Sequence, residues 1–464
     1  MKHVDIKMLL TDAERFAGSA VTVCGWIRTA RDSKTVSFVE LNDGTCLSNL
    51  QLVLDKSKDL GLGGANSLAV GTALMAVGTL VWSARNGYEM NVETITILGS
   101  CPSDFPLQKK RHSVEFLRTI PHLRVRTRYF EAVFAVRDQL SYAIHDYFHK
   151  HGYKYVHTPI ITGSDCEGAG EMFRVTTQPW DAGRKDGGAY PDADSYFADD
   201  FFGKKAGLTV SCQLEGEMAA MGLGKIYTFG PTFRAEHSNT TRHAAEFWQV
   251  EPEVCFAEID DIIEIAENFI KSIITGVLTN CKEEMAFFDQ WVEAGLLNRL
   301  NHVVNSEFGR VTYTEAVELL KKSEHEFKYP VEWGCDIQTE HEKYLADEYF
   351  KKPVFVVDYP AEIKAFYMKQ NADGKTVAAT DLLVPGIGEI IGCSERENDL
   401  EKLKQAMRKR GMALEEYEEY LDTRKFGSAP HSGFGLGLDR MMMYVTGISN
   451  IRDTLLFPRT VGSL

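Results

Sequence analysis

The sequence lacks the cysteine patterns of disulfide frameworks and zinc sites. Its 464 residues include nine cysteines, an odd number, and no two of them form a C-x-x-C pair. Disulfide scaffolds need paired cysteines, and zinc ribbons need closely spaced ones. We therefore expect free thiols in a reducing compartment and no structural zinc.

Long apolar runs are also missing. No stretch approaches the length needed to span a bilayer, and the first residues, MKHVDIKMLLTDAERF, contain no apolar core of a signal peptide. This segment also lacks the Arg-rich, acid-poor composition of a transit peptide. We expect a cytoplasmic protein that makes no membrane contact.

The common glycine-rich phosphate motifs are absent. No segment matches G-x-x-x-x-G-K-[ST], and neither GIGEIIG (386–392) nor GFGLGLDR (433–440) matches G-x-G-x-x-G after a first strand. The metalloprotease motif H-E-x-x-H is absent as well. If the chain binds a nucleotide, side chains must make the phosphate contacts that a glycine loop makes elsewhere.

Positive charge is in deficit, because 51 Lys and Arg residues face 66 Asp and Glu residues for a net charge of -15. This balance argues against indiscriminate binding of nucleic acid. Residues 108–130, QKKRHSVEFLRTIPHLRVRTRYF, are a basic exception. A solvated linker explains such a run, and so does a local contact with a polyanion.

The length of the chain predicts two domains or three. Residues 20–100 contain five short strand-like runs separated by turn signals, which favours a small β-barrel of the oligonucleotide-binding (OB) type. We assign residues 1–103 to this domain and residues 104–128 to a basic linker.

Residues 129–464 alternate between blocks of helical and strand-like patterns. Helical spacing covers 129–150, 258–325, 338–350 and 401–426. Strand-like runs cover 153–162, 208–212, 225–236, 245–256, 353–360, 364–369, 377–385 and 388–395. Segregated blocks of this kind predict an α+β domain in which helices flank an antiparallel sheet.

The segment FRAEHSNTTRHAAEFWQVEPE (233–253) combines many charges with aromatic residues. It reads as a β-hairpin, and a polar solvated loop is one explanation of its charges. The other is an anion site, in which Arg234 offers a two-pronged phosphate contact and Arg242 and His243 fold over a polyphosphate. Phe247 on the returning strand would then stack on a purine.

Two further segments carry candidate site residues. Asp381 and Glu389 lie at the two ends of a strand-turn-strand pattern in TDLLVPGIGEIIGCSERE, and paired carboxylates near phosphates suit Mg²⁺. Glycines 433, 435 and 437 would let their strand approach another group closely. Arg440 follows this strand at the start of a predicted helix. In the barrel, Phe38 is either a stacking platform for a base or a core residue.

Together these segments resemble the class II aminoacyl-tRNA synthetases of the aspartyl, asparaginyl and lysyl subgroup. HGYKYVHTPII is similar to motif 1 of that family, TFGPTFRAEHSNTTRHAAEFWQVEPE to motif 2, and GFGLGLDRMMMYVTGISNIRDTLLFPRT to motif 3. The barrel segment GWIRTARDSKTVSFVELNDG is similar to the anticodon-binding domain of the subgroup. The resemblance covers nearly the whole chain and implies a homodimer with Pro159 at its interface.

Within the subgroup the residues resemble the asparaginyl enzymes most, through SDCEGAGEMF, PGIGEIIG and PHSGFGLG. Aspartyl enzymes typically carry a lysine three residues after the glutamine that is Gln213 here, and this chain has Gly216 at that position. A buried carboxylate without a cation is costly, whereas a neutral amide needs only one donor and one acceptor. The expected substrates are therefore ATP, L-asparagine and tRNA(Asn), with Mg²⁺ as cofactor.

The resemblance also implies roles for individual residues, with Arg234, Glu236 and Arg440 as the candidate catalytic residues. In this assignment Arg234 would hold the α-phosphate of ATP, and Phe247 would stack on its adenine. His243 and Arg440 would hold the outer phosphates. Glu236 would contact either ATP or the acceptor end of the tRNA. Mg²⁺ would bind Asp381 and Glu389. Asparagine would contact Glu167 and Gln213 through its amino group and Arg396 through its side-chain carbonyl. The anticodon would contact Phe38 and Gln51, with Arg28 and Arg31 on nearby phosphates.

Some positions depart from the usual asparaginyl pattern. Cys393 and Glu395 stand in GCSERE where GGSQRE is usual, Cys212 replaces a glycine, and His237 replaces an asparagine. Glu395 is adjacent to Arg396, so its carboxylate either loosens selectivity or points to solvent. The Gly- and Asp-rich segment 180–196 is expected to be a loop near the site.

The expected reaction is activation of asparagine by Mg·ATP, followed by transfer to the 3′-end of tRNA(Asn) with release of AMP and pyrophosphate. Three alternatives stay open. The chain is an aspartyl enzyme or one of relaxed specificity, a non-catalytic RNA-binding relative, or a paralogue that makes asparagine. Gly216 argues against the first, the retained Arg234, Arg440, Asp381 and Glu389 against the second, and the barrel against the third.

Overall fold

The computed structural model describes residues 2–61, 68–166, 172–179, 190, 192–238 and 240–464. They form two compact units, Met1–Ala135 and Val136–Leu464. The expected linker at 104–128 falls within the first unit, and the exact domain boundaries stay a prediction. Each unit is described by itself below.

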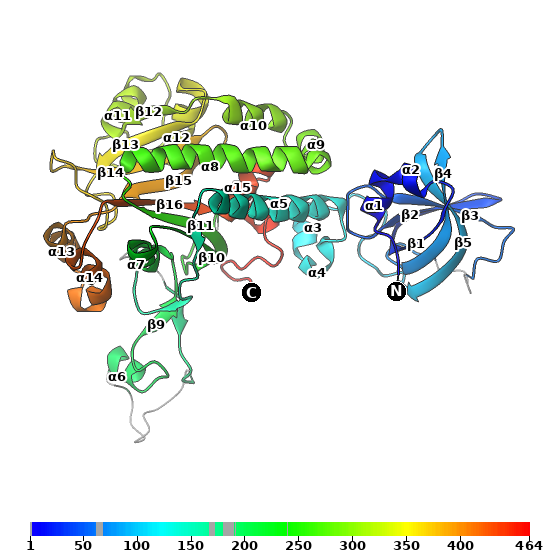
Figure 1. The fold of residues 1–464 in the computed structure, drawn as a ribbon, viewed down its shortest axis with the longest axis horizontal. Helices are drawn as coiled ribbons and strands as arrows, with labels where there is room; N and C mark the ends of the chain where they lie inside the picture. The colour runs from blue at the N-terminus through cyan, green and yellow to red at the C-terminus, as the bar shows by residue number, and fades with distance from the viewer. Residues whose placement is uncertain (1, 62–67, 167–171, 180–189, 191, 239) are drawn as a thin grey trace. The chain divides into compact units, whose positions relative to one another are not determined.

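The first unit contains a closed five-stranded barrel in the order β1-β2-β3-β5-β4, which confirms the predicted OB fold (Figure 1). Alternate side chains, such as Val39 and Leu41 on one strand and Leu50 and Leu52 on the next, are fully buried inside the barrel. This period of two leaves the intervening residues on its outer face. The strands are β1 (Ala20–Asp32), β2 (Val36–Asn42), β3 (Leu50–Asp55), β4 (Ala73–Ser83) and β5 (Gly87–Gly99).

Short helices complete the first unit. Ile6 and Leu9 of the first helix are buried in the barrel core. The helices of this unit are α1 (Ile6–Thr11), α2 (Ala13–Phe16), α3 (Val114–Arg118) and α4 (Pro121–Arg124), and α5 (Arg128–Lys150) begins at its end.

The second unit is built on an eight-stranded sheet in the order β12-β13-β14-β15-β16-β11-β10-β6. The six inner strands pair antiparallel, as predicted, whereas β12 and β6 at the two edges pair parallel with their neighbours. The strands are β6 (Lys154–Tyr155), β10 (Lys225–Phe233), β11 (Glu246–Cys255), β12 (Gly309–Thr312), β13 (Val354–Pro360), β14 (Thr376–Val384), β15 (Gly388–Glu395) and β16 (His431–Gly437).

Helices cover this sheet, and a small second sheet lies apart from it (Figure 1). The long helix α8 packs across β14, β15 and β16, and α7 packs on β10 and β11. The helices are α6 (Ala193–Ala198), α7 (Gln213–Leu223), α8 (Ile259–Asn280), α9 (Lys282–Trp291), α10 (Leu296–Asn305), α11 (Tyr313–Lys322), α12 (Thr339–Lys343), α13 (Leu400–Lys409), α14 (Glu418–Lys425) and α15 (Leu438–Thr446), with the π-helical turn η1 (Tyr344–Tyr349) and the 3-10 turns η2 (Leu414–Tyr417) and η3 (Ile451–Asp453). The second sheet has the order β7-β9-β8, with β7 (Ile161–Thr162), β8 (Arg174–Val175) and β9 (Ala206–Leu208).

Several predicted strands and helices differ from the observed ones in their bounds or type. The expected strand at 364–369 forms a single isolated bridge, from Met368 to Arg396, because Phe366 and Tyr367 are buried against α13 and α14 instead of alternating across a sheet. The expected strand at 153–162 is divided into β6 and β7, and the strand expected at 208–212 ends at Leu208. Edge strand β12 lies inside the stretch that was expected to be helical throughout.

Candidate functional site

The charged segment around Arg234 forms the predicted hairpin. β10 and β11 pair antiparallel with Thr232 opposite Phe247, so Arg234 directly follows β10 and Phe247 is the second residue of β11. The Arg234 guanidinium carbon lies 5.6 Å from the centre of the Phe247 ring. A cation and an aromatic face therefore stand side by side at the open end of the hairpin.

The loop of this hairpin is held at both ends by backbone hydrogen bonds. Arg234 N donates to Ala245 O at 3.0 Å, and Ala245 N donates to Arg459 O at 2.8 Å. Farther along the loop, Ile451 N donates to Thr241 O at 2.8 Å. The last residues of the chain thus fix the loop over the sheet.

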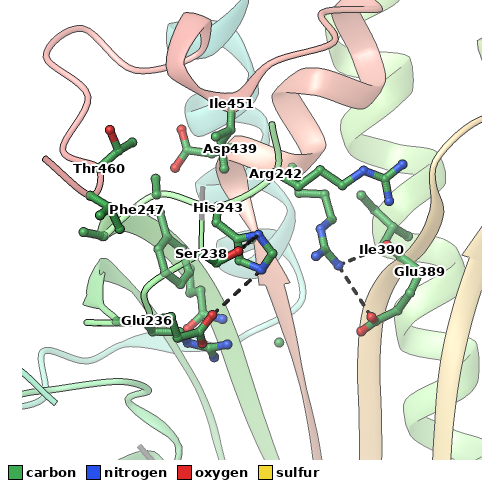
Figure 2. A pocket seen from close by; sticks show the side chains of 18 residues that line it. Glu236, Ser238, Arg242, His243, Phe247, Glu389, Ile390, Asp439, Ile451 and Thr460 are labelled. Atoms are coloured by element: carbon green, nitrogen blue, oxygen red, sulfur yellow. Dashed lines mark hydrogen bonds and ion pairs between the residues drawn. The ribbon is translucent and has the colours of Figure 1, made fainter. Parts of the chain in front are cut away.

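A cavity of about 280 Å³ opens beneath this loop. Figure 2 shows its lining side chains, which come from the hairpin, β15, β16, α15 and the C-terminal segment that contains Ile451 and Thr460. All six expected ATP-binding residues line it, namely Arg234, Glu236, His243, Phe247, Glu389 and Arg440. The fold has therefore gathered residues from three separate sequence segments around one space.

Polar contacts hold several of these side chains in place. His243 Nδ1 lies 2.5 Å from Thr240 Oγ1, and its Nε2 lies 3.8 Å from Glu236 Oε2 (Figure 2). On the opposite wall, Arg440 Nη1 lies 3.5 Å from Glu389 Oε2 and donates to the Glu389 carbonyl at 3.3 Å. The cavity is therefore lined by two pairs of an acid and a base, Glu236 with His243 and Glu389 with Arg440.

A second cavity of about 290 Å³ adjoins the first. The two share the lining residues Arg234, Gln249, Glu389 and Gly435, so Arg234 stands at their junction. Expected site residues Gln213, Asp381 and Arg396 line the second cavity. Glu167, the remaining expected asparagine contact, lies outside the described residues.

Arg396 is fixed at the base of the second cavity by acidic residues. Its Nη2 and Nε donate to the two carboxylate oxygens of Glu253 at 2.5 and 3.2 Å, and Nη1 donates to Ser394 Oγ at 2.6 Å. Burial pushes the pKa of Glu253 upward, and the charge of Arg396, which holds both carboxylate oxygens, opposes that rise. The guanidinium therefore enters the cavity already paired with a carboxylate.

Glu217 of α7 anchors a deeper layer of the same network. Its carboxylate contacts Arg424, accepts from Tyr420 Oη at 2.7 Å, and lies 3.1 Å from His431 Nε2. Gln213 Nε2 also donates to it at 2.9 Å. Burial alone would raise the pKa of Glu217, but Arg424, His431 and Arg396 hold it below its ordinary value.

The two expected metal ligands converge at Gly392. A Cβ on this glycine would lie 3.4 Å from Glu389 Oε1 and 3.5 Å from Asp381 Oδ1, so the two oxygens face the same space. Two carboxylates fit Mg²⁺, which takes few protein ligands and completes its shell with phosphates and water. Among the residues that the structure describes, no cluster of three or more His, Cys, Asp or Glu side chains suits a metal ion.

Sequence reasoning missed several residues of this site. Lys364 pairs with Asp381, with 2.6 Å between Nζ and Oδ2. Glu342 accepts a hydrogen bond from Glu389 N at 3.2 Å, and burial and the Glu389 charge raise its pKa to about 7. Glu251 and Glu253 follow Gln249 at intervals of two on β11, a period that could have placed all three on the cavity face. Lys364 and Glu342 carry no comparable signal.

The structure also shows where the residues that depart from the usual asparaginyl pattern lie. Glu395 is buried and pairs with Lys369 at 2.5 Å, so its carboxylate points neither into the cavity nor to solvent. Cys393 lines the second cavity, and burial raises the pKa of its thiol. Cys212 is buried, whereas His237 is exposed and has no structural explanation. Most of segment 180–196 lies outside the described residues.

The expected anticodon residues lie on the barrel. Phe38 is outside the barrel core and pairs across the strands with Arg31 and Val53, which argues against the core alternative. Gln51 Nε2 donates to Glu89 Oε2 at 2.7 Å on the same outer face. Arg28 instead contacts Asn42 at 2.9 Å and Glu131 at 3.3 Å, so its guanidinium is already paired.

The described part of the chain contains no helix that is long and apolar enough to cross a membrane. Residues 113–461 match the family model of class II tRNA synthetases (D, K and N), and residues 21–98 match that of the OB-fold nucleic acid binding domain.

Similar proteins match nearly the whole chain. It is 54% identical to the asparagine–tRNA ligase of Clostridium perfringens (strain 13 / Type A) over 463 residues, 99% of this chain and 98% of the relative. It is 53% identical to that of Acetivibrio thermocellus over 100% and 99% of the two chains. The crystal structure of asparaginyl-tRNA synthetase from Pyrococcus horikoshii complexed with asparaginyl-adenylate matches with a TM-score of 0.86 at 31% identity, over 100% and 99%.

Proposed function

We propose that this chain, which belongs to the class II tRNA synthetases (D, K and N), attaches asparagine to tRNA(Asn) at the expense of ATP. Full-length relatives at 52–54% identity are asparagine–tRNA ligases. The observation that carries the proposal is the junction of the two cavities at Arg234. One cavity suits a nucleotide, the other suits a small zwitterion, and the reacting groups would meet between them.

The reaction would take two steps without a covalent enzyme intermediate. An oxygen of the asparagine carboxylate attacks the α-phosphorus of ATP, and pyrophosphate leaves. The 3′-hydroxyl of the terminal tRNA ribose then attacks the carbonyl carbon of the adenylate, and AMP leaves as the hydroxyl proton is lost. Positioning and electrostatic stabilisation at phosphorus supply the rate in such a mechanism.

ATP would occupy the first cavity. Arg234 at the junction would bind the α-phosphate, and Phe247 beside it would stack on adenine. His243 and Arg440 would bind the outer phosphates, and Arg242, which also lines this cavity, is a further candidate. Burial and the adjacent Arg440 lower the pKa of Arg242, as expected for cations gathered at an anion site. Glu236 would contact ATP or the tRNA acceptor end.

Mg²⁺ would be held by Asp381 and Glu389, whose oxygens converge at Gly392. When bound there it would neutralise charge on the phosphates as pyrophosphate departs. Arg440 contacts Glu389 and would keep that carboxylate directed at the phosphates.

Asparagine would occupy the second cavity, with its amino group toward Gln213 and Glu167 and its side-chain carbonyl toward Arg396. Because Glu253 already neutralises Arg396, an aspartate carboxylate would find no free cation at that guanidinium. Gly216 supports the same preference, since a Cβ there would lie 3.5 Å from Glu253 Cγ. A lysine at this position would start beside Glu253, and the absence of that cation favours the neutral amide.

The anticodon of the tRNA would bind the outer face of the barrel. Phe38 would stack on a base, Gln51 would read its edge, and Arg31 would contact a phosphate. Arg28 would also contact a phosphate, provided that it exchanges its present partners Asn42 and Glu131 for the RNA.

We infer a homodimer from the exposed apolar residues that surround Pro159. Tyr155, Ile160 and Ile161 are exposed for 38–45% of their surface, which is unusual for large apolar side chains so close together. A sedimentation experiment that gave only a monomer would contradict this inference. We propose that the protein is cytoplasmic, because its cysteines are free thiols.

Charging of purified tRNA(Asn) tests the proposed function. The full-length protein with ATP, Mg²⁺ and labelled asparagine should transfer label to the tRNA, and tRNA whose terminal ribose has been oxidised with periodate beforehand should accept none. Formation of adenylate without any transfer would reject the second step, and no reaction at all would reject the function.

A further inference from the structure

Lys364 places a positive charge directly against a proposed metal ligand. It lies on the connection between β13 and β14, and its Nζ contacts Asp381 Oδ2 at 2.6 Å. The same Nζ lies 3.9 Å from the centre of the buried Tyr359 ring. Lys364 lines the second cavity, so its ammonium faces the space in which the substrates would meet.

Each proposed metal ligand uses one oxygen for a cation and leaves the other directed at Gly392. Asp381 Oδ2 contacts Lys364, while Oδ1 faces Gly392. Glu389 Oε2 lies 3.5 Å from Arg440 Nη1, while Oε1 faces Gly392. The two cations thus orient the carboxylates and at the same time neutralise them.

Both acids and bases gather around this point. The acids are Asp381, Glu389 and Glu342, whose carboxylate accepts from Glu389 N. The bases are Lys364, Arg440 and Arg242, and the two arginines line the first cavity. A free divalent cation therefore meets two converging oxygens whose carboxylate charges are already offset by Lys364 and Arg440. ATP would change this balance, because its phosphates bring several negative charges.

We propose that Lys364 is a resident counter-cation that keeps the affinity of this site for free Mg²⁺ low, so that the metal binds only together with ATP. This inference rests on the proposed ATP-dependent function. Two like charges a few ångströms apart repel each other strongly, and a unit charge about 5 Å from a dication changes its binding by about tenfold even at the dielectric constant of water. Lys364 acts here as a positioning residue for Asp381 that also prevents binding of metal without nucleotide.

Binding of Mn²⁺ as a probe of the Mg²⁺ site tests this inference without any turnover. Lys364→Gln removes the charge but keeps a hydrogen-bond donor for Asp381, and Lys364→Arg keeps the charge. In nucleotide-free titrations followed by electron paramagnetic resonance, Lys364→Gln should bind Mn²⁺ about tenfold more tightly than wild type. Lys364→Arg should stay within about threefold of wild type, because the unit charge is retained. Adding Asp381→Asn to Lys364→Gln should remove the gain.

Equal Mn²⁺ affinity of wild type and Lys364→Gln would overturn the inference, as would a gain that survives Asp381→Asn. A second experiment uses only the wild-type protein, and it applies if thermal unfolding shows that Lys364→Gln is not folded. Water proton relaxation should report Mn²⁺ bound to wild-type protein only after a non-hydrolysable ATP analogue is added, and the same signal without the analogue would also overturn it. Asparagine-dependent pyrophosphate exchange by the same preparation tests the proposed function separately.

Discussion

Among the individual side chains, Glu395 illustrates how a nearby cation removes a charge from a binding site. Its carboxylate follows directly after Ser394, which contacts Arg396, yet it pairs with Lys369 rather than facing the second cavity. The sequence alone left two outcomes for Glu395, namely loosened selectivity or exposure to solvent. In the structure this carboxylate points neither into the second cavity nor to solvent, because a lysine from a segment 26 residues earlier reaches it.

We predict that Glu395→Gln leaves the preference for asparagine over aspartate unchanged while it destabilises the protein. Loss of the charged hydrogen bond to Lys369 should lower the free energy of unfolding by about 1–3 kcal/mol. Denaturant titration measures the stability, and pyrophosphate exchange with both amino acids measures the preference. A marked rise in aspartate-dependent exchange would place this carboxylate in the site after all.

Arg234 is the side chain on which the proposed chemistry depends most, because it lines both cavities. Arg234→Ala should lower asparagine-dependent pyrophosphate exchange by about 10²–10³, the cost of removing one preorganised donor. Thermal unfolding of the variant serves as the folding control. A folded variant with a rate near that of wild type would rule out contact between Arg234 and the α-phosphate.

Among the strands and helices, the patterns with a strong period were predictable and the residues that connect them were not. The alternation along 225–236 and 245–256 predicted the hairpin that became β10 and β11. The run at 364–369 was misread as a strand because apolar residues buried against helices have no sheet period, and Lys364 was missed with it. The expected helix at 401–426 is divided near Gly411, whose φ of +71° lies outside the helical region.

Close packing between β16 and β11 should make the Arg396 network sensitive to one methyl group. A Cβ at Gly433 would lie 2.3–2.4 Å from the Glu253 carboxylate, so Gly433→Ala must displace Glu253 and with it Arg396. Overpacking of this kind costs about 1–3 kcal/mol, and we expect the KM for asparagine to rise about tenfold while that for ATP changes little.

Gly222→Ala on α7 is the matched control, because nothing lies within 4 Å of a Cβ at that position. It should leave both KM values unchanged and stabilise the helix by up to about 1 kcal/mol. Equal effects of the two substitutions on the KM for asparagine would show that Gly433 packing does not support the site.

For the molecule as a whole, the residues expected to bind the anticodon and those expected to bind ATP and asparagine belong to two separate units. The barrel strands belong to Met1–Ala135 and both cavities to Val136–Leu464. The barrel was predictable because five short alternating strands leave few other closed arrangements. Which buried acids meet which cations in the second unit was not predictable, since partners such as Glu217 and Arg424 are 207 residues apart.

This division predicts that a substitution on the barrel affects tRNA without affecting asparagine activation. Phe38→Ala should weaken tRNA binding by about 1–3 kcal/mol, the usual contribution of stacking on one base. It should change pyrophosphate exchange less than about twofold, because exchange needs no tRNA. Thr94→Ala, an exposed residue on β5, is the control. Unchanged charging kinetics in Phe38→Ala would remove Phe38 from the anticodon interface.

Pyrophosphate exchange with asparagine and aspartate side by side tests the central claim most directly. Because Arg396 is already paired with Glu253, the side-chain carboxylate of aspartate finds no free cation at that guanidinium, and burying it there costs several kcal/mol. We predict exchange with asparagine that exceeds exchange with aspartate by at least about 10² in kcat/KM. Exchange with aspartate as efficient as with asparagine, or no exchange with asparagine, would contradict the account.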